Sequence, residues 1–162
     1  MSRRPLVVMS VFAALVVASC ATATVVMTVN TPAADAPQTA PQFEVDAAWP
    51  KPLPNRWLMG QAAGVAVDRH DHIWVIQRPR SLTEDERGAT LNPPRSICCV
   101  PAPAVLEFDA QGNLLSSWGG PGAGHGWPLN EHGIFVDHED NVWIGGNGPK
   151  DGQVFKFTRT GQ

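Results

Sequence analysis

The sequence contains no tyrosine, and only 17% of its residues are charged. Its 12 basic and 15 acidic residues give a formal net charge of -3, which provides no electrostatic basis for binding nucleic acid. No C-x-x-C pair, G-K-[ST] phosphate loop or G-x-S-x-G nucleophile elbow occurs in it. The chain is instead rich in turn formers, with 15 glycines and 15 prolines, and it has six tryptophans. This composition favours short strands joined by tight turns, and hence an all-β fold.

Residues 1–20 have the pattern of an export signal. Two arginines lie near the start, Leu6 to Ala18 is an uncharged apolar run, and Val17-Ala18-Ser19-Cys20 has the form of a lipobox. We therefore expect an exported protein, periplasmic or in the cell envelope, that touches the membrane only through the signal or a lipid on Cys20. Two alternatives remain open: a secretory signal whose cleavage discards Cys20, and an uncleaved anchor, because apolar residues continue through Val29.

The remaining two cysteines, Cys98 and Cys99, are neighbours in the sequence. Export places them in an oxidising compartment, which predicts a disulfide, either between them or to a partner molecule. A metal or redox role is the alternative. Residues 21–42 are rich in proline, alanine and threonine and are interpreted as a linker, so the folded domain is expected to span 43–162.

Two copies of one pattern occupy this domain. In each copy a glycine begins an alternating apolar segment that ends at an aspartate. A second segment begins at another aspartate, seven residues after the glycine, and contains a tryptophan between two aliphatic residues. The copies start at Gly64 and Gly133. Each reads as strand, tight turn, strand, because large apolar residues alternate on both sides of a polar turn. Asp68 and Asp137 are expected to fix the turn geometry.

Further strands follow in both copies. Val105–Phe108 and Val154–Phe157 are each followed by a turn with a glycine seven residues after the valine, and 113–118 forms a fourth strand in the first copy. The first copy has 20 more residues between its tryptophan and its third strand than the second copy has. We interpret residues 78–103 as an inserted loop outside the repeat.

The two copies resemble the NHL repeat, whose members form β-propellers, commonly six-bladed with four antiparallel strands per blade. The resemblance covers residues 64–162. It implies an incomplete propeller of about two blades, the N-terminal fragment of a six-bladed ring, with Phe43–Val45 and Trp57–Met59 as candidates for the edge strand that closes it. Two blades leave apolar faces uncovered, so we expect this fragment to fold poorly alone.

Within that family the second copy is most similar to bacterial relatives of peptidyl-hydroxyglycine α-amidating lyase, through Glu131-His132-Gly133-Ile134, Asn141–Ile144 and Gln153–Phe157. The resemblance implies zinc as a cofactor, with calcium also used in the family. It places a zinc ligand at His132 and a channel-facing catalytic arginine at Arg78. The lyase motif has an Asp and a His before its last segment, where this chain has Gly145 to Gly152, and the lyase tyrosine has no counterpart here.

Three function classes remain open from the sequence. The favoured one is an exported propeller scaffold that binds a small molecule, a peptide or a protein at its channel mouth. The second is a zinc-dependent lyase or hydrolase in a full-length form, of which this fragment would be an inactive part, because one histidine cannot hold zinc. The third is an oxidoreductase or lactonase-type propeller, related by fold alone.

Overall fold

The computed structural model describes residues 40–122, 124 and 126–162, and the fold lies in one compact unit, Phe43–Gln162. These residues form nine strands, two 3-10 helices and no α-helix. The elements are β1 (Trp57–Leu58), β2 (Gln61–Val67), β3 (Ile73–Arg78), η1 (Pro79–Ser81), η2 (Gly88–Thr90), β4 (Val100–Pro101), β5 (Val105–Phe108), β6 (Leu114–Trp118), β7 (Glu131–Val136), β8 (Val142–Gly146) and β9 (Val154–Phe157).

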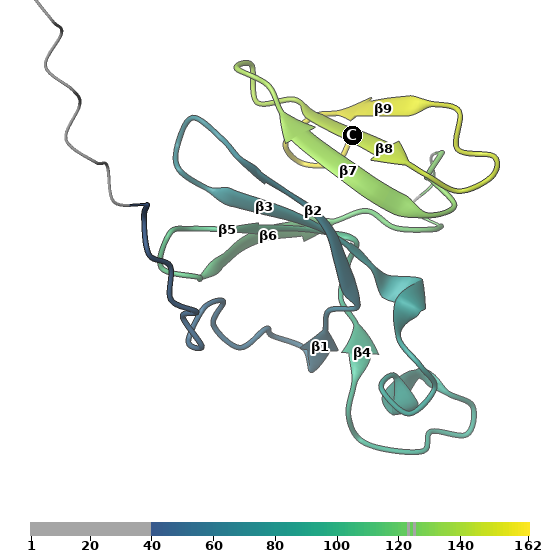
Figure 1. Ribbon diagram of the computed structural model, residues 1–162. Coiled ribbons are helices and arrows are strands. Elements are labelled where there is room, and N and C mark those ends of the chain that lie inside the picture. Colours follow the sequence, from purple (N-terminus) through teal and green to yellow (C-terminus); the bar gives the residue numbers. More distant parts are fainter. Residues whose placement is uncertain (1–39, 123, 125) are drawn as a thin grey trace, which may run out of the picture. The chain divides into compact units, whose positions relative to one another are not determined.

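Most strands belong to two antiparallel sheets (Figure 1). One sheet has the order β2-β3-β5-β6 and the other has the order β7-β8-β9, so consecutive strands pair within each sheet. The fold is therefore all-β, as the composition and the alternating segments predict. The strands expected from the two sequence copies are all present.

Four tight turns share one geometry, which explains the equal spacings in the sequence; three of them join the strands of hairpins and the fourth follows β9. In each turn a backbone N–H bonds back to the carbonyl three residues earlier, at Asp71, Gly112, Asp140 and Gly161. All four of these residues have positive φ, between 60° and 84°. A left-handed residue at this place gives the strands of a hairpin the twist they need. Glycine supplies it twice and aspartate supplies it twice, since aspartate tolerates that region better than most side chains.

The aspartates that end β2 and β7 hold these turns, as the sequence predicts. Asp68 accepts hydrogen bonds from the N–H groups of His70 and His72, at 2.8 and 3.0 Å, and from Trp74 Nε1 at 3.0 Å. Asp137 makes the same three contacts in the second copy. One carboxylate thus satisfies two turn donors and fixes the indole of the following strand.

A hydrophobic core lies between the two sheets. β2 and β3 contact β7, so the first strands of the two sheets are neighbours. The buried side chains of this core come from both sheets: Trp74, Ile76, Val105, Val136, Val142, Ile144 and Phe157. The other face of the second sheet, which points away from this core, is open. Phe135 and Val154 on that face are 62% and 68% exposed.

A second core covers the other face of the first sheet. Val75, Leu106 and Phe108 pack there against the segment 49–59, which contributes Trp49 and Trp57 among others. The structure differs here from the edge-strand expectation. Residues 43–45 form no strand, and β1 pairs in parallel with β4 of the inserted loop.

The inserted loop is more closely attached to the domain than its sequence suggests. Leu82 and Ala102 are buried, and β4 hydrogen-bonds with β1. Its apex is different, because residues 92–98 are all exposed. Cys98 and Cys99 lie at the end of this apex and are joined to each other as a disulfide.

Limited digestion with trypsin should therefore cut first after Arg95. Its side chain is 62% exposed, its ion pair with Glu84 is on the surface, and the single backbone hydrogen bond of its N–H goes to Gly88 within the same loop. Exposed surface ion pairs hold a loop weakly. Mass spectrometry of the first products should show the 95–96 cut, and Arg95→Gln should delay it. Earlier cutting within β2 or β3 would contradict this arrangement.

Candidate functional site

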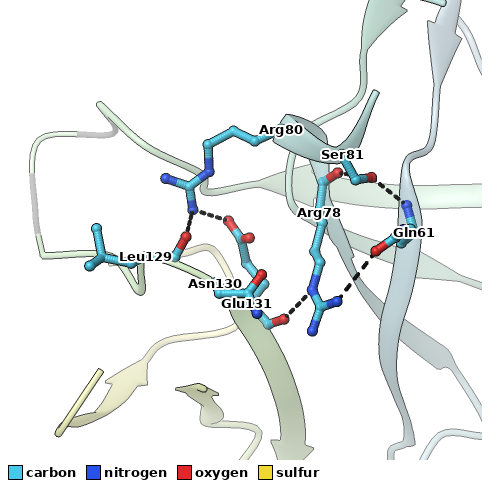
Figure 2. Close-up of a pocket in the computed structure, with 7 residues that line it drawn as sticks. All are labelled: Gln61, Arg78, Arg80, Ser81, Leu129, Asn130 and Glu131. Atoms are coloured by element: carbon cyan, nitrogen blue, oxygen red, sulfur yellow. Dashed lines mark hydrogen bonds and ion pairs between the residues drawn. The ribbon is translucent and has the colours of Figure 1, made fainter. Parts of the chain in front are cut away.

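A cavity of about 300 Å3 lies where β2 and β7 begin and β3 ends (Figure 2). The lining residues come from all three strands, from η1 and from the segment that leads into β7: Gln61, Arg78, Arg80, Ser81, Leu129, Asn130 and Glu131. The cavity thus lies at one end of the two neighbouring sheets. Two arginines line it, and only Arg80 pairs with the carboxylate of Glu131.

Arg78 is the last residue of β3, and the strand register sets it opposite Gln61. Its Nε donates to the backbone oxygen of Glu131 at 2.7 Å, and its Nη1 donates to Gln61 Oε1 at 3.3 Å. Both acceptors are neutral. Within the described part of the chain, no carboxylate forms an ion pair with Arg78. The positive charge of this half-buried guanidinium therefore has no carboxylate partner at the cavity.

Glu131 is the buried acid of the site, with 1% of the residue exposed. Its Oε1 accepts a hydrogen bond from Trp127 Nε1 at 2.8 Å and forms an ion pair with Arg80 Nη2 at 3.2 Å. A buried carboxylate needs such partners, since desolvation of an unpaired charge is costly. One residue thus fixes both arginines, Arg80 through its side chain and Arg78 through its backbone.

Two further groups hold the rim of the cavity. Ser81 Oγ donates to the carbonyl of Arg78 and accepts from the N–H of Gln61, both at 2.8 Å. Asp151 accepts from the N–H groups of Leu129 and Asn130, at 2.7 and 2.9 Å. The hydrogen bond from Leu129 is the main reason that the pKa of Asp151 lies below its usual range, although partial desolvation opposes it.

His132 lies beside this cavity in an irregular part of β7. The pairing of β7 with β8 shifts between Glu131 and Gly133, so His132 is the extra residue of a β-bulge. The first copy has the same bulge at Ala63. Bulges redirect a side chain, and His132 is exposed. The structure therefore brings the two residues assigned by resemblance, Arg78 and His132, to the same end of the sheets.

Another group of side chains could hold a metal by composition. Asp68, His72 and Glu107 offer ligand atoms that lie within 4.8 Å of one another. The guanidinium of Arg159 already lies among them, with Nη1 at 3.0 Å from Asp68 Oδ2 and Nη2 at 2.6 Å from His72 Nδ1, and it also pairs with Glu107. An arginine supplies the positive charge that the two carboxylates require, so the arrangement fits an ion-pair network between the sheets better than it fits a metal.

Asp68 is the anionic centre of that network. Burial alone would raise the pKa of Asp68, but hydrogen bonds from Trp74, His72 and His70 and the charge of Arg159 lower it to about 2. The sequence assigns Asp68 to the turn, and it gives no sign of Arg159, which lies 91 residues further along the chain.

Several predicted features lie outside the described residues. Cys20, the signal at 1–20 and most of the linker at 21–42 are among them. Within the described residues, no helix is long and apolar enough to span a membrane. No sequence pattern indicates Arg80 or Trp127 as site residues, and Glu131 enters only as part of the motif that carries the resemblance, without a role. Arg80 lies two residues after Arg78, and that spacing is a signal that could have drawn attention to the pair.

Comparison with known proteins adds no assignment. No protein-family model matches the chain, and no curated protein sequence matches it significantly. The function must therefore be argued from the site itself.

Proposed function

We propose that this chain is part of an exported NHL-type propeller scaffold that binds a carboxylate-bearing small molecule or peptide in the cavity beside Arg78. The observation that carries the proposal is the environment of Arg78. Its guanidinium is half buried, is held by two neutral oxygens and points toward a cavity of about 300 Å3. A planar guanidinium in this state is suited to a carboxylate, which it can bind with two parallel hydrogen bonds.

The repeat geometry supports the scaffold part of the proposal. The two sheets share turn geometry, the aspartate contacts to turn and tryptophan, and a bulge at the same position. Their first strands are neighbours, as strands around a channel would be. The ligand would then lie at the channel mouth. The proposal also includes export and lipid attachment at Cys20, because residues 1–20 have the pattern of a signal that ends in a lipobox.

A zinc-dependent lyase, present only in a longer form of the protein, is the second candidate. The nearness of Arg78 to His132 favours it, because Arg78 donates to the carbonyl of the residue directly before His132. The described residues do not fit a zinc site by themselves, since no group of metal-ligating side chains among them includes His132. One imidazole leaves the coordination shell of zinc unfilled.

Binding of propionate tests the proposed function. The full chain should bind propionate weakly, with a dissociation constant on the order of 10 mM, as expected for one charge-assisted contact. Arg78→Gln should weaken binding about tenfold or more, since such contacts contribute about 1.5–3 kcal/mol. Isothermal titration or NMR titration would measure it.

Arg95→Gln is the matched control, because it removes one positive charge from the same loop at an exposed position. Melting temperatures of both variants should be compared with that of the unaltered chain. If Arg78→Gln binds propionate as well as Arg95→Gln does, Arg78 is not the carboxylate site.

A further inference from the structure

A second cavity, of about 320 Å3, shares Arg80 with the first. It is lined by Pro79, Arg80, Arg87 and Pro101. Arg80 therefore lies between two cavities, with Arg78 in one and Arg87 in the other. Its own position is fixed, because Nη2 bonds to the carbonyl of Pro128 at 3.0 Å and pairs with Glu131.

Of the two arginines that line the second cavity, Arg80 pairs with Glu131, whereas Arg87 has no carboxylate partner among the described residues. No described carboxylate forms an ion pair with Arg87, which is half buried. Of the three acids just before Arg87 in the sequence, Glu84 pairs with Arg95 and Glu86 accepts hydrogen bonds from Thr83. The third, Asp85, is exposed and forms no ion pair with Arg87 in the described part of the chain. Pro79 and Pro101 supply stiff, apolar walls. A cavity with a cationic side chain and apolar walls is suited to an anionic group on a short hydrocarbon chain.

We infer that the cavity between Arg80 and Arg87 is a second anion subsite, so that the ligand carries two acidic groups. This inference rests on the proposed function, which assigns the first acidic group to Arg78. Because Arg80 lines both cavities, the proposal treats the two subsites as neighbouring parts of one site. The ligand class is therefore a flexible organic diacid, with one carboxylate at Arg78, the other at Arg87 and the connecting chain passing Arg80.

A diacid gains from both subsites at once. When one carboxylate is bound, the other is held near its subsite at a high effective concentration, which tightens binding without any new type of contact. A monoacid has no such gain. The ratio of the two dissociation constants thus reports on the second subsite, while the monoacid constant reports on the first.

The test compares propionate with the diacids succinate, glutarate and adipate on the full chain, by titration at one fixed ionic strength. We expect at least one diacid to bind about tenfold or more tightly than propionate. In Arg87→Gln that ratio should fall to about two, the statistical advantage of having two equivalent groups, and Arg87→Lys should restore part of it. Arg95→Gln should keep the full ratio, which separates a subsite from a general loss of charge.

The two proposals can fail separately. If every diacid binds the unaltered chain no more than about twice as tightly as propionate, the second subsite is refuted, while an effect of Arg78→Gln on propionate still supports the first. If the diacid preference is the same in Arg87→Gln and Arg95→Gln, the assignment to Arg87 is refuted. If propionate binding does not depend on Arg78, the proposed function itself fails.

Discussion

Replacing Trp74 with alanine is expected to lower the free energy of unfolding by about 3–5 kcal/mol, the range for a fully buried large aromatic side chain. Trp74 is 0% exposed and lies in the core between the two sheets. Its Nε1 donates to Asp68, and Arg159 lies over its ring at 5.2 Å from the ring centre. The substitution therefore leaves a cavity and removes a partner of a buried carboxylate. Urea denaturation followed by circular dichroism, on a form of the protein that unfolds cooperatively, would measure the loss.

Trp143→Ala is a matched control supplied by the repeat. Trp143 is the equivalent residue of the second sheet and donates to Asp137 in the same way, at 2.8 Å. It lies on the open face of that sheet and is only partly buried. Its removal should cost markedly less, about 1–2 kcal/mol. Equal losses for the two tryptophans would contradict the assignment of Trp74 to an interface between the sheets.

Asp68→Asn is expected to remove part of the acid sensitivity of the protein. The pKa of Asp68 in the folded protein is about 2, below the value of 3.8 for an unperturbed aspartate. Its contribution to stability is thus complete above about pH 4 and is lost as the pH falls toward 2. Allowing for solvent screening, we expect about 1–2 kcal/mol from this group. Melting curves between pH 2 and pH 6 would show the difference in slope.

Asp71→Asn controls for the loss of one negative charge in the same turn. Asp71 is exposed and has a φ of 60°, which asparagine also tolerates. This variant should keep the pH dependence of the unaltered chain. If Asp68→Asn and the unaltered chain lose stability in parallel below pH 4, the hydrogen bonds to Asp68 do not act as the structure indicates.

The local structure was predictable because short-range rules govern it. The alternating segments, the tight turns and the roles of Asp68 and Asp137 all depend on residues within about ten positions of one another. Arg78 and His132, which the resemblance names as site residues, lie at the same end of the sheets, and their roles stay a prediction. Whether the sheets are blades of a closed ring stays a prediction.

The remaining features depend on contacts that no local pattern encodes. Arg80 reaches Glu131 across 51 residues, and Arg159 reaches Glu107 across 52. β4 consists of Val100 and Pro101 and is too short to show the alternation of a strand. The pairing of β4 with β1 attaches the inserted loop to the domain. It also places Pro101 of β4 in the wall of the second cavity. Such features could be recognised only once the sheets were placed side by side.

The most direct test of the proposed ligand site is the side-chain NMR signal of Arg78. In a spectrum of the full chain labelled with nitrogen-15, the Nε–H resonance of Arg78 should shift progressively as propionate is added, because its guanidinium gains a carboxylate partner. The signal is assigned by its disappearance in Arg78→Gln, and the resonance of Arg95 should stay in place under the same conditions. A saturable shift confined to the cavity residues would support the account. Equal, non-saturating shifts of Arg78 and Arg95 would contradict it.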